Sequence, residues 1–199
     1  GDAAKGAKLS AFHGVPQVLG YDGYDALLAG DAVDAVYIAL PNGQHADFAI
    51  RAARAGKHLL VEKPLAVTVA ESEAMIAAAD KAGVLLMTAY RLHNEPGNLA
   101  LLDHVRQGAI GTPLIFQSVF GFQIAPGNHR LKASHWGGPL QDLGVYCINA
   151  ARHVFGEEPV EALASLNRPA CDPRFGEVEA SFAGTLRFPS GGLAQFVAS

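Results

Sequence analysis

The stretch HLLVEKPLAV, residues 58–67, begins as an apolar run, ends that run on a glutamate and a lysine, and then meets a proline. A short continuous apolar run is typical of a strand buried on both faces of a parallel sheet. Glu62 and Lys63 are residue types that rarely lie buried, and Pro64 fixes its φ angle at about −65°. Because ligands bind at the carboxyl ends of parallel strands, we expect Lys63 to face a cleft. The alternative is a solvated lysine at an ordinary strand end.

Two similar apolar stretches flank this strand, and helical segments connect all three. AVDAVYIALPN (32–42) and VLLMTAYR (84–91) each predict a strand, and residues 45–58 have helical periodicity. Thr68-Val69-Ala70-Glu71 matches a capping box that begins a second helix. This alternation predicts a parallel sheet with right-handed crossovers and helices on both faces.

The pattern changes after Arg91. A helix ending at Gly108, a strand over 113–124, a long polar loop and a helix over 140–156 are followed by three further strands. Helices followed by adjacent strands predict a separate α+β unit with a mostly antiparallel, open sheet. We expect the boundary between the two units near residues 90–95.

Composition excludes several classes of function. The chain has 199 residues, 50% of them hydrophobic, a formal net charge of −4 and no basic block, so we expect no nucleic-acid partner. No apolar run approaches the roughly 20 residues of a membrane span. The two cysteines show no metal spacing, which favours a reducing, cytoplasmic setting. His129 and His135 lack cysteine or carboxylate neighbours, so we expect no metal site.

A second group of polar residues lies in GGPLQDLGVYCIN, residues 137–149. Asp142, Tyr146 and Asn149 are four and three residues apart, which places them along one face of a helix. A phenol with a pKa near about 10 acts as an acid or base near neutrality only with help, and a lysine cation such as Lys63 supplies it. The structural alternatives are a carboxylate at a helix start and a packed tyrosine.

The sequence resembles the Gfo/Idh/MocA oxidoreductases. The resemblance rests on AVYIALPNGQHADFAIRAARAGKHLLVEKPLA (35–66), YRLHNEP (90–96) and the 137–149 segment. It is greatest to the branch that contains glucose–fructose oxidoreductase and the dimeric dihydrodiol dehydrogenases. It implies a Rossmann domain followed by an α/β domain, NAD or NADP as cofactor, and a sugar, polyol or diol as substrate. It also implies a homo-oligomer, a dimer or tetramer, in the full-length protein.

The resemblance also implies roles for individual residues. Lys63, Tyr146 and Asp142 are expected to be catalytic, with Tyr146 as general acid/base, Lys63 as its electrostatic partner and Asp142 as substrate anchor. The expected substrate-binding residues are these three and Asn149. The expected cofactor-binding residues are Leu40, Pro41, Asn42, His45, Glu62, Lys63, Pro64 and Arg91.

The family's first strand and Gly-rich phosphate loop have no counterpart in this sequence. We therefore expect a fragment, with a partial NAD(P)-binding domain over 1–92 and a partial substrate-binding or oligomerisation domain over 93–199, inactive by itself. Two alternatives to a dehydrogenase remain open. One is a non-catalytic sugar- or metabolite-binding or regulatory protein derived from this fold. The other is a structural subunit that assembles through the second sheet.

Overall fold

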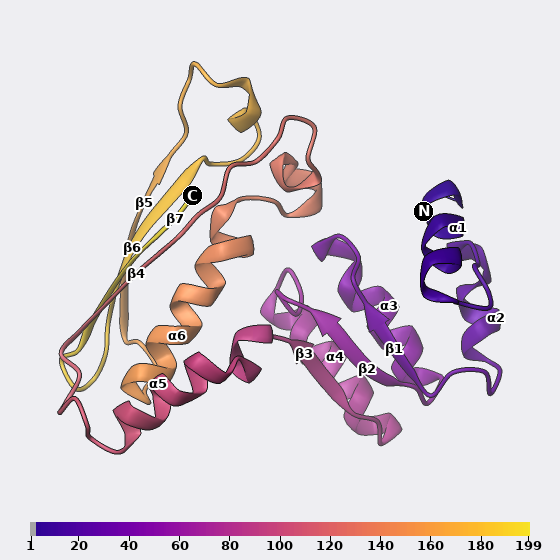
Figure 1. Ribbon diagram of the computed structural model, residues 1–199, viewed down its shortest axis with the longest axis horizontal. Coiled ribbons are helices and arrows are strands. Elements are labelled where there is room, and N and C mark those ends of the chain that lie inside the picture. The colour runs from indigo at the N-terminus through magenta and orange to yellow at the C-terminus, as the bar shows by residue number, and fades with distance from the viewer. Residues whose placement is uncertain (1–2) are drawn as a thin grey trace.

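The computed structural model describes residues 3–199, which form two sheets that each have a helical layer (Figure 1). The bounds of the helices and strands, in chain order, are α1 Ala3–His13, α2 Tyr24–Leu28, β1 Ala35–Ile38, α3 His45–Arg54, β2 His58–Glu62, α4 Val69–Ala82, β3 Leu86–Ala89, α5 Pro96–Arg106, β4 Ile115–Phe120, α6 Val145–Phe155, β5 Glu161–Asn167, β6 Ser181–Arg187 and β7 Leu193–Ala198. The predicted division into a parallel and a mostly antiparallel sheet is confirmed.

The first sheet has the order β1-β2-β3, and all its strands are parallel. The predicted capping box is present, because the Thr68 side chain accepts a hydrogen bond from the Glu71 backbone and Glu71 reaches back to Thr68. Gly83 ends α4 with a positive φ of 68°, a conformation that glycine adopts without steric cost. These local signals determine where α4 begins and ends, and therefore where β3 can start.

The expectation of helices on both faces of this sheet is wrong for the described residues. The helices α3 and α4 pack against each other, and Ala49, Ala53 and Met75 share one core cluster with Leu59 and Val61 of β2. The reason is the strand order, because two right-handed crossovers that step in the same direction place both helices on one face. On the opposite face, three residues of neighbouring strands lie side by side: Tyr37 of β1, Leu60 of β2 and Met87 of β3.

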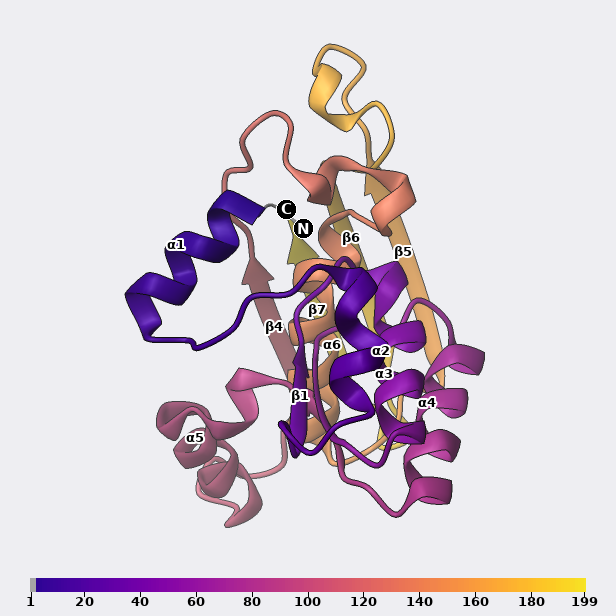
Figure 2. The same ribbon diagram turned by 90° about the vertical axis from the view of Figure 1, so that its right-hand side faces the viewer.

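The second sheet has the order β4-β7-β6-β5, with β4 and β7 parallel and the other pairs antiparallel. One face packs on α6, which lies between the two sheets in Figure 1. Figure 2 shows the same order of layers from the side, with the first sheet and its helices in front of α6 and the second sheet behind. The other face of the second sheet stays open and displays Val119 and Leu163, which are 81% and 74% exposed.

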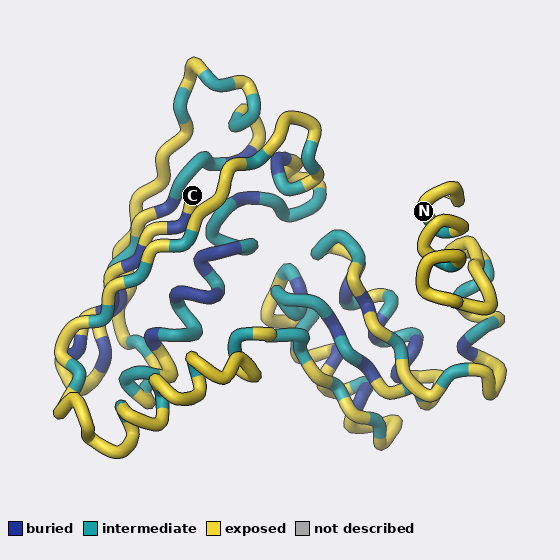
Figure 3. Tube along the Cα trace, in the orientation of Figure 1, coloured by how far each residue is buried: buried dark blue, intermediate teal, exposed yellow. Residues whose placement is uncertain are grey.

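Most of the buried residues in the described part of the chain fall into two separate cores (Figure 3). One lies between the first sheet and its helices, and the other between α6 and the second sheet. No residue of α1 is buried. Among residues 3–199, no helix has both the length and the apolar character that crossing a bilayer requires.

Candidate active site

A cavity of about 250 Å³ lies where the strand ends of the first sheet face the loop before α6. Leu40, Asn42, Glu62 and Lys63 line it from the carboxyl ends of β1 and β2. The other wall consists of His129, Arg130, His135, Trp136, Gly137 and Asp142. The cavity therefore lies at the rim where ligands bind in open parallel sheets, as the sequence predicts.

Lys63 reaches across to the segment that leads into α6. Its Nζ donates to the Asp142 carbonyl oxygen at 2.6 Å and to Asp142 Oδ1 at 2.7 Å. The Lys63 and Asp142 side chains are only 11% and 17% exposed, so this ion pair is largely removed from water. The buried strand β2 sets the position of the lysine, and Asp142 sets the direction of its ammonium group.

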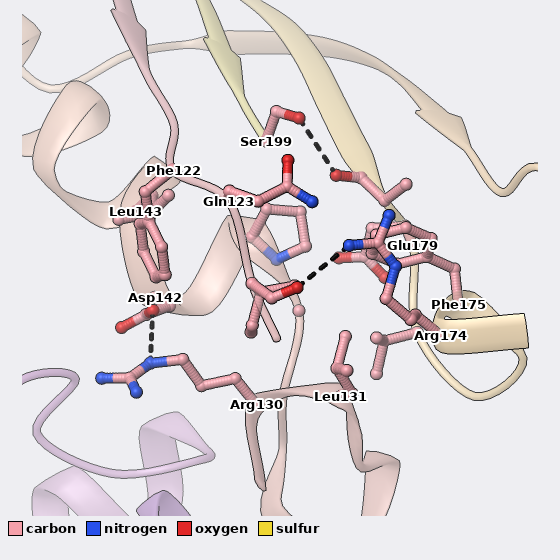
Figure 4. A pocket seen from close by; sticks show the side chains of 15 residues that line it. Phe122, Gln123, Arg130, Leu131, Asp142, Leu143, Arg174, Phe175, Glu179 and Ser199 are labelled. Carbon is pink, nitrogen blue, oxygen red and sulfur yellow. Dashed lines mark hydrogen bonds and ion pairs between the residues drawn. The ribbon is translucent and has the colours of Figure 1, made fainter. Parts of the chain in front are cut away.

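Asp142 lies in a π-helical turn, Leu140–Gly144, that leads directly into α6. Its second carboxylate oxygen, Oδ2, accepts a hydrogen bond from Arg130 Nε at 2.7 Å (Figure 4). Both carboxylate oxygens are thus engaged by cations. Charge-assisted bonds of this length are stronger than neutral ones. Asp142 is therefore built to hold two cations in place.

Tyr146 is buried one turn further along α6. The Lys63 ammonium lies 4.9 Å from the centre of its ring, and the rings of Tyr90 and Phe120 pack around it. Burial raises the pKa of the Tyr146 phenol, while a hydrogen bond and the charge of Arg91 act in the opposite direction. Arg91 therefore supplies the charge that opposes the effect of burial, while the Lys63 ammonium, which we expect to favour the phenolate, forms its ion pair with Asp142.

Some of the sequence-predicted residues do not line the cavity. His45 is fully buried, and its Nδ1 and Nε2 each lie 2.9 Å from a carbonyl oxygen, those of Pro64 and Leu40. The His45 side chain therefore links the turn after β1 to the turn after β2 and does not face the cavity. Asn149 Oδ1 lies 2.6 Å from His93 Nε2, so its side chain is already engaged. The others that do not line the cavity are Pro41, Pro64, Arg91 and Tyr146.

Three residues of the loop before α6 lie at the cavity although the sequence did not predict a role for them there. Arg130 reaches Asp142 only because the loop folds back on the helix start. Trp136 has a positive φ of 52°, and its carbonyl oxygen accepts a hydrogen bond from the Asn42 side chain at 3.2 Å. His135 Nδ1 is buried and has no hydrogen-bond partner in the described part of the chain. No sequence motif marks these positions, because their surroundings form only when the loop folds against α6 and the end of β1.

Comparison with known proteins places this geometry in a family. Residues 2–90 match the family described as "Oxidoreductase family, NAD-binding Rossmann fold", and residues 99–199 match the "GFO/IDH/MocA C-terminal domain". The chain is 41% identical over 180 residues to the uncharacterized oxidoreductase ORF334 of Rhizobium meliloti, covering 90% of this chain and 53% of that protein. It is 36% identical over 202 residues to D-xylose 1-dehydrogenase (NADP(+)) 2 of Haloferax volcanii, covering 100% and 59% respectively.

A solved structure gives the same result. The aldose-aldose oxidoreductase of Caulobacter crescentus, complexed with glycerol, superposes with a TM-score of 0.94 at 42% identity, covering 100% of this chain and 61% of that one. This chain thus spans between 53% and 61% of the length of these three proteins. With both family domains matched in order along its length, the chain belongs to the Gfo/Idh/MocA family of oxidoreductases.

Proposed function

We propose that this protein is an NAD(P)-dependent oxidoreductase that transfers hydride between nicotinamide and a CH–OH or carbonyl group of a sugar, polyol or diol. One observation carries the proposal. The Lys63 ammonium, held 2.7 Å from Asp142 Oδ1, lines a cavity between the two sheets and lies 4.9 Å from the ring of the buried Tyr146. A cation and a phenol side by side are the groups that a proton transfer to or from a carbinol oxygen requires. Two of the relatives named above are a D-xylose dehydrogenase and an aldose-aldose oxidoreductase, and the third is an oxidoreductase whose name gives no substrate.

The residues of the cavity fit a nicotinamide ring. Leu40 supplies an apolar wall, and the His135 Nδ1 atom is a buried polar atom without a partner in the described residues. Such an atom in a cavity is satisfied by a ligand or an ordered water. Leu40, Asn42, Glu62 and Lys63 would hold the ring, which when bound accepts or supplies hydride. The cofactor is NAD or NADP.

We assign the remaining chemistry to three side chains. Lys63 donates a hydrogen bond to the substrate oxygen, and Asp142 keeps the ammonium directed at that point. Because burial raises the pKa of Tyr146, the phenol stays protonated at neutral pH and can donate a proton to a carbonyl oxygen that is being reduced. In the oxidative direction the same group must lose its proton, which the charge of Arg91 favours.

The test is Tyr146→Phe in the native protein. We expect turnover with aldoses, polyols or diols, followed by the absorbance of the reduced nicotinamide, to fall by about 100-fold or more, which is the usual contribution of general acid–base catalysis. The Kd for NAD(P) should stay unchanged. Tyr21→Phe is the matched control, because Tyr21 is 52% exposed and packs on Phe48. Unchanged turnover in Tyr146→Phe would reject the assignment.

A second function is a non-catalytic sugar- or metabolite-binding or regulatory protein. The observation that favours it is the position of Tyr146, which does not line the cavity and whose hydroxyl accepts a hydrogen bond from Arg91. Under this alternative, sugars bind with a measurable Kd but no nicotinamide is reduced with any of the substrates tested.

We also propose three features of the whole protein. The division into domains over 1–92 and 93–199 is supported by the two separate cores. A homo-oligomer is supported by the open face of the second sheet, where Val119 and Leu163 are exposed. A cytoplasmic location is supported by the free cysteines Cys147 and Cys171.

A further inference from the structure

A second cavity, of about 210 Å³, lies within the second half of the chain (Figure 4). It is enclosed by the segment after β4, the loop before α6 and the segment before β6. Its wall is mainly apolar, with Phe122, Leu143, Phe175 and Val178, and Ala180 lines it just before β6. The hydride transfer proposed above does not use this cavity.

The two cavities share a wall. Arg130 and Asp142 line both of them, and their 2.7 Å ion pair lies at that wall. At about 250 and 210 Å³, each cavity is smaller than the roughly 300–1,000 Å³ typical of sites for small organic ligands, whereas together they fall within that range. If a nicotinamide ring fills part of the first cavity, the room for a substrate of more than one ring lies beyond the Arg130–Asp142 pair.

The polar groups of the second cavity have unused capacity. Glu179 has no hydrogen bond or ion pair with any of residues 3–199. The Arg130 bond to Asp142 uses Nε, which leaves the two terminal nitrogens of the guanidinium as donors. In Arg174, by contrast, each of the three guanidinium nitrogens already donates to Asp172 or to the Ile124 carbonyl oxygen, which fixes this side chain as part of the wall.

This distribution selects a class of ligand. Arg130 lies at the wall shared with the first cavity, Glu179 adds an acceptor carboxylate on another side, and Phe122 and Phe175 also belong to the lining. A sugar ring carries hydroxyl groups that both donate and accept along its edge, and it has apolar faces. A phosphate or a second carboxylate would meet the Glu179 carboxylate as a like charge, at an energetic cost. The cavity therefore suits a neutral polyhydroxylated ring.

We propose that the second cavity binds the distal sugar ring of a glycoside while the ring that reacts lies beside Lys63. This inference rests on the proposed function and deepens it, because it names a disaccharide or similar glycoside as the preferred substrate class. Glu179 accepts hydrogen bonds from the distal ring, and Arg130 contacts it where the two cavities meet. Arg130 and Glu179 are then specificity-determining residues.

The experiment compares an aldose with a disaccharide that has the same aldose at its reacting end. Glu179→Gln should lower the ratio of the disaccharide's kcat/KM to the monosaccharide's by about tenfold, the usual cost of losing a hydrogen bond to a charged group. Ala180→Leu, which fills the cavity, should lower the ratio in the same way. Glu177→Gln is the matched control, because Glu177 lies two residues away and pairs with Lys132 at the surface, and it should leave the ratio unchanged. Thermal unfolding of each variant shows that it is folded.

A second readout separates failure of this inference from failure of the proposed function. Saturation-transfer NMR with the disaccharide, without cofactor, measures binding alone. The protein could bind the disaccharide, lose that binding in Glu179→Gln, and yet oxidise no sugar. This result would support the inference and reject the oxidoreductase function. Turnover of the monosaccharide with a ratio that neither Glu179→Gln nor Ala180→Leu changes would overturn the inference and leave the function standing. A native protein that turns over both sugars without preferring the disaccharide would overturn the inference as well.

Discussion

Removing the Asp142 carboxylate tests how far the site depends on one contact between the end of β2 and the turn before α6. In Asp142→Leu, the Lys63 ammonium loses its counter-ion and keeps only the backbone carbonyl of residue 142. Arg130 loses its partner as well, but its side chain is 40% exposed and water replaces the bond. The cost therefore arises mainly at Lys63, whose side chain is 11% exposed.

The magnitude follows from this exposure. Removing one partner of a buried ion pair costs about 3–5 kcal/mol, because the other charge remains desolvated. Because Lys63 keeps its bond to the backbone carbonyl, we expect Asp142→Leu to lower the free energy of unfolding by about 3 kcal/mol, the lower end of this range. The lost bond to Arg130 adds little, because exposed ion pairs contribute about 0–1 kcal/mol. For a protein of this size, such a loss lowers Tm by roughly 6–12 °C.

The assay is urea unfolding followed by two probes. Far-UV circular dichroism reports on the helices. Fluorescence reports on Trp136, the single tryptophan of the chain, which lines the cavity beside Asp142. Because the ion pair joins the residue after β2 to the turn before α6, we expect the fluorescence transition to move at least as far as the circular dichroism transition. Glu161→Gln, which removes an exposed pair with Arg187, is the control and should leave both midpoints in place.

The double variant Lys63→Met/Asp142→Leu decides whether the reasoning is correct. Replacing both charges by apolar groups removes the unpaired ammonium, so the double variant should be more stable than Asp142→Leu alone. The reasoning is refuted if Asp142→Leu costs less than about 1 kcal/mol, or if the two single losses simply add in the double variant.

Three further predictions concern other parts of the chain. Burial raises the pKa of Tyr90 and of Tyr146, so the folded state holds these protons more tightly than the unfolded state. Stability should then be complete below about pH 10 and fall as the pH rises further, seen as a falling urea midpoint; a midpoint that is flat up to about pH 11 would contradict this. Met75→Ala, at a fully buried position, should cost about 2–5 kcal/mol in the same urea assay, and a loss below about 1 kcal/mol would place Met75 outside the core. Val119→Lys, on the open face of the second sheet, should weaken self-association in sedimentation experiments without lowering Tm, and unchanged association would remove that face from the interface.

The secondary structure could be predicted from the sequence because its signals are local, whereas the roles of the site residues stay predictions. The run that ends at Glu62, the Thr68 capping box and the glycine after α4 each act within a few residues. Lys63 directly follows the last residue of β2, so the chain direction places it at the carboxyl edge of the sheet, where it lines the cavity. The family resemblance predicts that Lys63 and Asp142 belong to one site, and the structure adds a 2.7 Å ion pair between them that the sequence did not predict.

What the sequence alone could not determine depends on contacts between distant segments. The placement of α3 and α4 on one face follows from the order of the strands, which no local pattern encodes. The role of His45 as a buried link between two turns, and of Arg130 as the second partner of Asp142, depends on where loops return in space. Tyr146 shows the difference most clearly, because its position in a helix is a local property, whereas its pKa is set by burial and by Arg91, which lies 55 residues earlier in the chain. Hydrophobic periodicity fixes the elements, but solvation and charge at a site are properties of the packed structure.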